Sequence, residues 1–476
     1  MAQPSRRLTR VRRLLVLSAL AAVFPTAAAQ AARPLELGLT DNAFQASDDA
    51  TRNLWLDRAK DSRADVVLLG AVWPQIAPST RPPDFNPADP GDPAYRWEML
   101  DAAVRAASAR GLTVMISIYQ APGWAEGADH PGTAGGGTWR PDPTEIANFS
   151  RALAARYSGS FADPANPAVA LPAVRRWQLW AEPNLTNLMP QWEGKSPVSP
   201  HHYRAMLNAF YGAMKSVSTA NLVVTGGTGP YGDPSGVGRM RPLRFWRELL
   251  CLRGRRLRRT ECPAPAHFDV LAHHPINAGP PRRSALNASD VTTPDVHKLR
   301  RVVRRAVRVG TALPQRRKQL WATEFWWQSR PPDPNGVSAR RHARFLQEAL
   351  YLLWRQRVET AIWFQIRDPA TIDTGSSFET GLFFQDGAPK LAYRAFRFPF
   401  VTEAIGKRRQ ARVRAWGKAP SPGSVVIQTK RRGRWRNLKR IRAGGNKVFL
   451  ASLRLRRPAT LRAIAGGESS LPWHQR

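Results

Sequence analysis

Two stretches of the chain each place a glutamate directly after a short aromatic run. Residues 175–184 read Arg-Arg-Trp-Gln-Leu-Trp-Ala-Glu-Pro-Asn, and residues 319–327 read Gln-Leu-Trp-Ala-Thr-Glu-Phe-Trp-Trp. The aromatic and aliphatic residues suit a buried strand, and Pro183 cannot donate a hydrogen bond to a neighbouring strand. We therefore expect Glu182 and Glu324 at the ends of two strands.

Two strand-end carboxylates with tryptophan walls suit the hydrolysis of a glycosidic bond. One carboxyl group protonates the leaving oxygen and the other attacks the anomeric carbon. We expect Glu182 to be the acid/base, held protonated by the apolar wall of Trp180 and by repulsion from an ionised Glu324. The alternative for either glutamate is a structural role as a buried carboxylate paired with a barrel arginine.

The elements that position these residues alternate between strands and helices. Strands are predicted at residues 35–39, 66–72, 113–119, 174–180, 222–226, 269–273, 319–323 and 360–366. Helices with apolar residues three and four apart are predicted at 95–110, 144–157, 202–217, 296–309 and 338–355. This alternation predicts an α/β fold, a (β/α)8 TIM barrel over residues 32–402. The competing architecture is an open doubly wound sheet, but no glycine-rich phosphate turn follows the first strand.

The pattern changes in residues 403–476, where short alternating runs are separated by Gly, Pro and basic turns. This predicts a small antiparallel β-sandwich-like accessory module. Two roles remain open for the module, an inert stabilising spacer or a contact with carbohydrate or cell wall.

Over residues 35–400 the chain resembles the retaining glycoside hydrolases of clan A, the cellulase-like family 5 and its neighbours. The motifs that carry the resemblance are Trp-Ala-Glu-Pro-Asn at 180–184, His-His-Pro at 273–275, Thr-Glu-Phe at 323–325, and Trp363. The resemblance implies that Glu182 is the acid/base and Glu324 the nucleophile of a retaining glycosidase. Together with the export signal described below, this predicts a secreted enzyme that acts on an oligo- or polysaccharide with β-linkages.

The sequence departs from that family at three places. Ala181 stands where an asparagine usually binds the sugar 2-hydroxyl, and Ile276 stands where a tyrosine often supports the nucleophile. Residues 66–69 offer no arginine on the second strand. These departures favour an alternative function, a catalytically impaired glycan-binding or cell-envelope protein on a degenerate barrel.

Other residues near the strand ends are candidates for binding substrate. His273 and His274 should face opposite sides of a strand. The resemblance implies that His274 is the one that points into the barrel mouth, although a structural role is the alternative. Trp363 is either the floor under the sugar or barrel packing, and Asp368 is left unassigned. The remaining candidates for the wall of the cleft are Tyr119, Trp124, Trp180, Asn184 and Trp326.

Residues 1–31 have the pattern of a secretory signal peptide, with a basic start, an apolar core at 14–24 and small residues before residue 32. The alternative is an uncleaved membrane anchor. Cys251 and Cys262 are expected to form a disulfide in an exported protein, with two free thiols as the alternative. No cluster of Cys and His has metal-ligand spacing, so no metal or cofactor is expected.

The formal net charge is +37, and the basic residues are spread along the chain. We expect an electrostatic attraction to an anionic cell envelope or polysaccharide rather than specific nucleic-acid recognition, because the sequence contains no nucleic-acid reader motif. The protein is expected to be a monomer.

Overall fold

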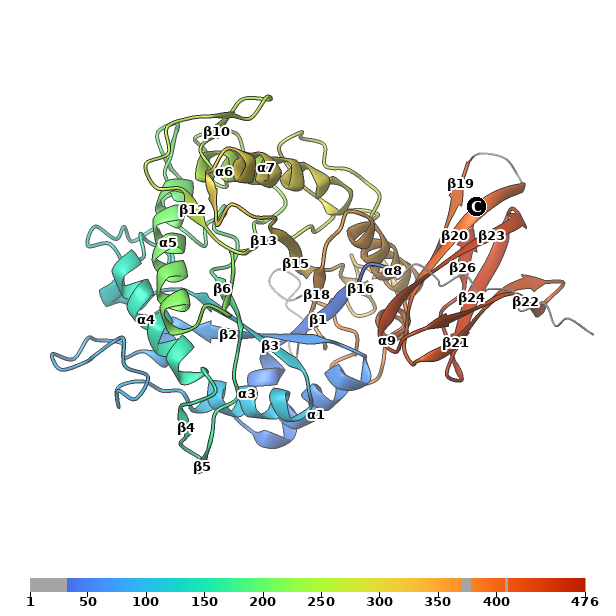
Figure 1. Cartoon of the computed structure of the whole chain (residues 1–476), viewed down its shortest axis with the longest axis horizontal. Helices are drawn as coiled ribbons and strands as arrows, with labels where there is room; N and C mark the ends of the chain where they lie inside the picture. Colours follow the sequence, from blue (N-terminus) through green and yellow to red (C-terminus); the bar gives the residue numbers. More distant parts are fainter. Residues whose placement is uncertain (1–31, 370–377, 407–409, 476) are drawn as a thin grey trace, which may run out of the picture. The chain divides into compact units, whose positions relative to one another are not determined.

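Eight parallel strands close into a barrel in the computed structural model, which describes residues 32–369, 378–406 and 410–475 (Figure 1). Around the barrel the order is β1-β18-β15-β13-β9-β6-β3-β2. The strands are β1 (Glu36–Thr40), β2 (Val66–Val72), β3 (Thr113–Tyr119), β6 (Arg176–Leu179), β9 (Leu222–Val224), β13 (Val270–His273), β15 (Gln319–Phe325) and β18 (Thr360–Phe364). Because β1 pairs with both β2 and β18, the predicted TIM barrel is confirmed and the open sheet is excluded.

The helices follow the strands and cover the barrel. They are α1 (Asp49–Asp61), α2 (Trp73–Ile76), α3 (Glu98–Ala109), α4 (Pro143–Arg156), α5 (Ser199–Val217), α6 (Pro242–Leu249), α7 (His297–Arg308), α8 (Ala339–Arg355) and α9 (Leu391–Arg397), with 3-10 turns η1 (Asn42–Gln45), η2 (Gly123–Ala125) and η3 (Thr293–Asp295). The start of α4 is fixed by Asp142, whose side chain accepts hydrogen bonds from the backbone N–H groups of Thr144 and Glu145. The core side of α7 is formed by Leu299, Val302, Val303 and Ala306, spaced three and four apart.

The barrel interior is filled by apolar side chains that are at most 2% exposed. They are Val66, Met115, Val224, Val270, Ala272, Trp321 and Ile362. Together they come from six of the eight strands, so the interior is a packed core. Chemistry is therefore confined to the ends of the strands and the loops that follow them.

Short two-stranded sheets lie in the segments that connect the barrel strands and helices. They are β4 (Ala162–Asp163) with β5 (Asn166–Ala170), β7 (Trp192–Glu193) with β8 (Ser196–Pro197), β10 (Leu252–Arg253) with β11 (Arg258–Arg259), β12 (Ala266–His267) with β14 (Ala312–Leu313), and β16 (Ser329–Arg330) with β17 (Val337–Ser338). A disulfide joins Cys251 and Cys262, whose Cα atoms are 5.7 Å apart, and closes the loop that contains β10 and β11.

The C-terminal strands form two antiparallel sheets, as the alternating pattern predicts. They are β19 (Phe400–Ile405), β20 (Gln410–Ala419), β21 (Gly423–Arg431), β22 (Arg434–Ala443), β23 (Lys447–Arg456), β24 (Ala459–Ala465), β25 (Glu468–Ser469) and β26 (Trp473–Gln475). One sheet has the order β19-β20-β23, and the other β22-β21-β24-β25 with β26 beside β24.

The two C-terminal sheets are joined to the barrel by packing and by ion pairs. The rings of Tyr351 in α8 and Trp416 in β20 are 5.6 Å apart, and the buried Nζ of Lys418 lies 2.7 Å from Oδ2 of Asp65. Residues 33–476 form one compact unit. β19 begins at Phe400, just before the expected boundary at residue 402.

The export segment predicted at residues 1–31 lies outside the described residues. Within the part of the chain that the structure describes, no helix has the length and apolar character needed to cross a membrane.

Candidate active site

Glu182 reaches the barrel mouth through a tight reversal of the chain after β6. Trp180 and Glu182 both have positive φ angles, 72° and 49°, a conformation that non-glycine residues adopt at an energetic cost. The backbone N–H of Glu182 donates a hydrogen bond of 2.8 Å to the carbonyl of Gly227, in the loop after β9. The strained turn is thereby anchored to the neighbouring strand, and it holds the carboxylate at the carboxyl end of the barrel.

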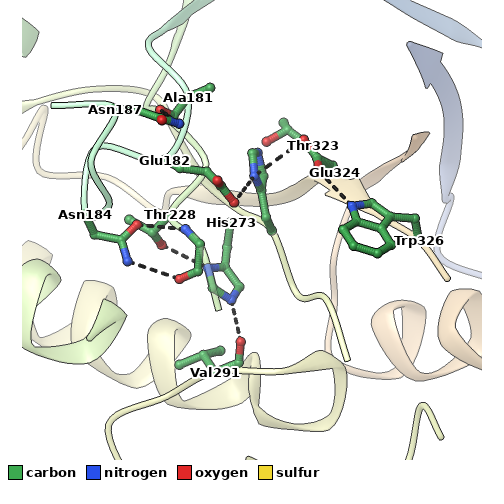
Figure 2. A network of polar contacts seen from close by, with 12 residues as sticks. Ala181, Glu182, Asn184, Asn187, Thr228, His273, Val291, Thr323, Glu324 and Trp326 are labelled. Atoms are coloured by element: carbon green, nitrogen blue, oxygen red, sulfur yellow. Dashed lines mark hydrogen bonds and ion pairs between the residues drawn. The ribbon is translucent and has the colours of Figure 1, made fainter. Parts of the chain in front are cut away.

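Glu182 and Glu324 converge on one imidazole, as Figure 2 shows. Nδ1 of His274 lies 3.1 Å from Oε1 of Glu182 and 3.7 Å from Oε2 of Glu324. His274 follows β13, and Glu324 is the next-to-last residue of β15, so three strand ends contribute one group each. The predicted meeting of the two glutamates at the barrel mouth is present in the structure.

The two adjacent histidines point in opposite directions. Nε2 of His273 lies 2.9 Å from the carbonyl of Val291 and therefore carries the hydrogen, so its Nδ1 accepts a 2.9 Å hydrogen bond from the hydroxyl of Thr228. Burial is the largest cause that lowers the pKa of His273, to about 3, so this ring is neutral. His273, labelled in Figure 2, is structural, whereas His274 contacts both carboxylates.

The protonation of His274 and Glu324 depends on burial and on the charges of the neighbouring groups. Burial alone lowers the pKa of His274, but the charge of Glu324 and the hydrogen bond and charge of Glu182 outweigh it, and the net shift is upward. Burial raises the pKa of Glu324 and repulsion from Glu182 adds to the rise, while His274 and the indole of Trp326 oppose it. That Glu182 rather than Glu324 holds the proton stays a prediction.

Trp326 is the residue that most directly supports Glu324. Its indole N–H donates a hydrogen bond of 2.8 Å to Oε1 of Glu324, and its ring packs against Phe378 at 5.1 Å. A donor aimed at a carboxylate favours the ionised form. Trp326 is also partly exposed, and its role in binding substrate stays a prediction.

Three of the predicted substrate contacts are instead internal, and two of them lie in the loop after β6. The amide of Asn184 is fully buried, donates to the carbonyls of Gly229 and Met240, and accepts from the N–H of Gly229. Trp180 is 1% exposed, with its indole bound to the carbonyl of Asn187. These two residues close the loop, and neither side chain offers a surface to a sugar.

Trp363 is the third internal residue. It is 0% exposed, and its indole donates to the carbonyl of Thr380 at 3.0 Å. Its ring lies between Phe325 and Trp327, at 5.1 and 6.3 Å. Of the two roles open to Trp363, the structure supports barrel packing over the floor of a sugar site.

Tyr119 and Trp124 are partly exposed at the end of β3 and in the following loop. The indole of Trp124 donates to the carbonyl of Pro78, and its ring meets Trp73 and Phe85 edge-on. Trp124 thus belongs to an aromatic cluster beneath these loops. A role for either residue in substrate binding stays a prediction.

Several residues that hold the site were not predicted from the sequence. Gln178, inside β6, is 2% exposed and donates to the carbonyl of Thr225 and to the hydroxyl of Thr323, one residue before Glu324. A polar residue within an apolar strand was the available signal. Asp368, left unassigned, is buried and lies 2.6 Å from Nζ of Lys390, so it is a structural ion pair.

Two of the three departures from the family pattern, Ala181 and Ile276, lie in the loops that follow β6 and β13. Ala181 forms a bridge with Gly227, and its carbonyl accepts a 3.3 Å hydrogen bond from the amide of Asn187. Ile276 is partly exposed, and its N–H donates to the carbonyl of His274. Neither side chain carries a polar group. In the described residues, no group of three or more His, Cys, Asp and Glu side chains is arranged to hold a metal ion.

No protein-family model matches the sequence, and no curated protein matches it. Among solved structures, a family 39 glycoside hydrolase from Bacteroides cellulosilyticus WH2 is similar, with a TM-score of 0.55, 15% identity, and coverage of 89% of this chain and 81% of that one. A glucosidase from Croceicoccus marinus has a TM-score of 0.52 and 14% identity, covering 90% of this chain and 95% of that one. At such identities the similarity shows that this chain shares the fold of these two proteins.

Proposed function

We propose that the protein is a retaining glycoside hydrolase that cleaves O-glycosidic bonds in a β-linked glycan. The observation that carries the proposal is the convergence of Glu182 and Glu324 on Nδ1 of His274. Oε1 of Glu182 and Oε2 of Glu324 lie 3.1 and 3.7 Å from Nδ1 of His274, so these two oxygens cannot be farther apart than the sum of the two distances. That limit is compatible with the separation of about 5–5.5 Å between the carboxyl groups of retaining enzymes.

In the first step, an oxygen of ionised Glu324 attacks the anomeric carbon while the bond to the leaving oxygen breaks. Glu182 transfers its proton to that oxygen, so the aglycone leaves as a neutral alcohol. The hydrogen bond from Trp326 supports this assignment of roles, because a donor at Oε1 favours the anion that a nucleophile requires.

In the second step, Glu182 removes a proton from water, and the water oxygen attacks the anomeric carbon of the glycosyl-enzyme ester. The bond to Glu324 breaks, and its carboxylate is restored. His274 has a raised pKa, and in its protonated form it offsets the repulsion between two nearby carboxyl groups through both steps. His274 is therefore a positioning residue rather than a proton donor to substrate.

The experiment is hydrolysis of a panel of aryl β-glycosides by the parent and by Glu182→Gln and Glu324→Gln. Each variant should lower kcat/KM by about a thousandfold or more while the fold remains intact. Glu193→Gln is the matched control, since Glu193 is exposed and pairs with Arg140 away from the carboxylates. If the parent cleaves no glycoside but binds glycans, the alternative of a binding protein on a degenerate barrel replaces the enzyme.

Azide separates the two roles. In Glu324→Ala azide displaces the leaving group once and gives a product of inverted configuration. In Glu182→Ala azide intercepts the glycosyl-enzyme, and the two displacements give net retention. The anomeric configuration of the glycosyl azides, measured by NMR, assigns the nucleophile and the acid/base. If Glu324→Ala gave retention and Glu182→Ala gave inversion, Glu182 would be the nucleophile and Glu324 the acid/base.

We also infer that the protein is secreted and contacts anionic polymers of the cell envelope. The C-terminal residues 403–476 contain Glu403 and Glu468 as their only acidic residues. The edge strand β22 exposes basic side chains, Arg434, Arg436, Lys439, Arg440 and Arg442. Recovery of the protein from culture medium with an N-terminus near residue 32 tests secretion, and salt-sensitive co-sedimentation with anionic but not neutral polysaccharide tests the contact.

A further inference from the structure

A second pocket lies at the end of the barrel opposite the carboxylates. Its volume is about 690 Å³, and its floor includes Leu271 and Leu320, each the second residue of its strand, β13 and β15. Val303 and Val307 of α7 form its apolar side. Glu182 and Glu324 lie at the carboxyl ends of strands, so the length of the barrel separates the two sites.

The polar wall of this pocket, called here the basic pocket, is dominated by cations. The lining cationic residues are Arg300, Arg304, Arg308, Arg317, Lys318 and Arg357. The acidic lining residue is Glu359. One of its oxygens contacts Arg317, and the other accepts a 2.9 Å hydrogen bond from the N–H of Leu320. Both oxygens of Glu359 therefore already have a partner within the protein.

Four of the guanidinium groups have no carboxylate partner in the described part of the chain. They are Arg300, Arg304, Arg308 and Arg357. Nη2 of Arg300 is buried and has no hydrogen-bond partner. A buried, unsatisfied donor costs free energy unless a ligand completes it.

The positive charges also act on one another. Burial lowers the pKa of Arg300 to about 10, and the repulsion of Arg357 and Arg33 adds to this shift despite the nearby Glu359. A fold that keeps several guanidinium groups around one hollow with a single carboxylate, Glu359, leaves a strong positive potential there. The arrangement fits an anion much better than a neutral ligand.

We propose that the basic pocket binds a ligand carrying more than one phosphate group. Planar guanidinium groups form paired, charge-assisted hydrogen bonds with phosphate oxygens, and several of them around one hollow suit several phosphates. The volume lies within the range of about 300–1,000 Å³ typical of small-molecule sites. The ligand is either a small oligophosphate or the end of a phosphate-bearing polymer.

The test is calorimetric titration of the full chain with tripolyphosphate at low salt. We expect one molecule per chain, with binding that weakens as salt is added. Arg304→Gln/Arg357→Gln removes two exposed cations of the pocket and should lower the affinity about tenfold or more. Arg255→Gln/Arg256→Gln removes the same charge from the exposed loop between β10 and β11 and should leave the affinity unchanged.

Two comparisons complete the experiment. If each long-chain polyphosphate molecule binds with an affinity similar to that of tripolyphosphate, the pocket is a small-ligand site. If the polymer binds much more tightly, and the Arg304→Gln/Arg357→Gln variant loses this binding, the pocket recognises the end of a polymer. The proposal is overturned if tripolyphosphate does not bind, or if both double variants weaken it equally, since diffuse surface charge then explains the affinity. Melting curves of the variants verify that each is folded.

Discussion

Nδ1 of His274 lies 3.1 Å from Oε1 of Glu182, although the two residues follow strands that are not neighbours in the barrel. The strand between them, β9, ends early at Val224 and is followed by Gly226 and Gly227. A Cβ atom on Gly227 would lie 2.2 Å from Nε2 of His274. The missing side chain at position 227 is what lets the imidazole reach across to Glu182.

Gly227→Ala should therefore displace the imidazole and break its contact with Glu182. We expect kcat/KM to fall at least about tenfold, together with a loss of about 1–3 kcal/mol in the free energy of unfolding from overpacking. Gly212→Ala in α5 is the control, because a methyl group at that position would meet no atom within 4 Å, and a helical Gly→Ala change is neutral or stabilising. Full activity in Gly227→Ala would show that the His274–Glu182 contact is dispensable.

The raised pKa of His274 predicts a pH-dependent stability. A histidine whose folded pKa exceeds its ordinary value of 6.5 stabilises the fold fully below that pH, and the contribution is lost as pH rises through the folded pKa. The stability difference between the parent and His274→Gln should thus shrink above pH 6.5. Chemical unfolding across this range measures it, with His297→Gln, on the exposed surface of α7, as the control. A difference that grows with pH would contradict the ion pairing.

The sequence was sufficient to predict the barrel and the meeting of Glu182 and Glu324 at its mouth, for physical reasons. Both glutamates follow barrel strands, and the carboxyl ends of parallel strands meet at one mouth. That His274 joins them was implied by the family resemblance, because strand alternation shows only that His273 and His274 face opposite sides. The roles of Trp180 and Trp363 could not be predicted in this way. Their positions at strand ends were recognised, but exposure depends on the loops that cover them, such as the backbone of Asn187 over Trp180.

Trp326→Phe should test the support of the nucleophile. The change keeps an aromatic ring but removes the hydrogen bond to Oε1 of Glu324, so the pKa of Glu324 should rise further. We expect kcat/KM to fall about 10- to 100-fold, and the acidic limb of its pH profile to move to higher pH. Trp192→Phe removes an indole bond to the carbonyl of Gly238 and is the control. A loss without a shift of the acidic limb would mean that Trp326 acts only through packing.

The buried ion pair of Lys390 and Asp368 predicts a large effect on stability. Both side chains are 2% exposed, and Nζ of Lys390 also lies 2.8 Å from the hydroxyl of Ser329. Lys390→Met leaves a buried carboxylate unpaired and should cost about 3–5 kcal/mol of unfolding free energy. Arg239→Met, which breaks the exposed pair with Asp233, should cost about 1 kcal/mol or less. Equal losses in the two variants would show that burial of the Lys390 pair has no energetic consequence.

The final prediction concerns the apolar residues beside the carboxylates, Ala181 and Ile276. A site built to hydrogen-bond a hydroxyl rejects the analogue that lacks it, because its own polar group is left unpaired, whereas Ala181 leaves nothing unpaired. The parent should therefore discriminate weakly between a glycoside and its 2-deoxy analogue. Ala181→Asn should restore discrimination and raise kcat/KM on the natural sugar, provided that the turn held by Trp180 and Glu182 is kept.

The gain from Ala181→Asn should stay below the several kcal/mol that 2-hydroxyl contacts contribute, because Ile276 still offers Glu324 no hydrogen bond. Combining it with Ile276→Tyr should do more than the two changes separately, since members of one catalytic network are not additive. The measurement is kcat/KM of the parent, both single variants and the double variant on one aryl glycoside and its 2-deoxy analogue. If the parent is inactive and the double variant stays inactive on every glycan that it binds, the carboxylates serve glycan binding rather than hydrolysis.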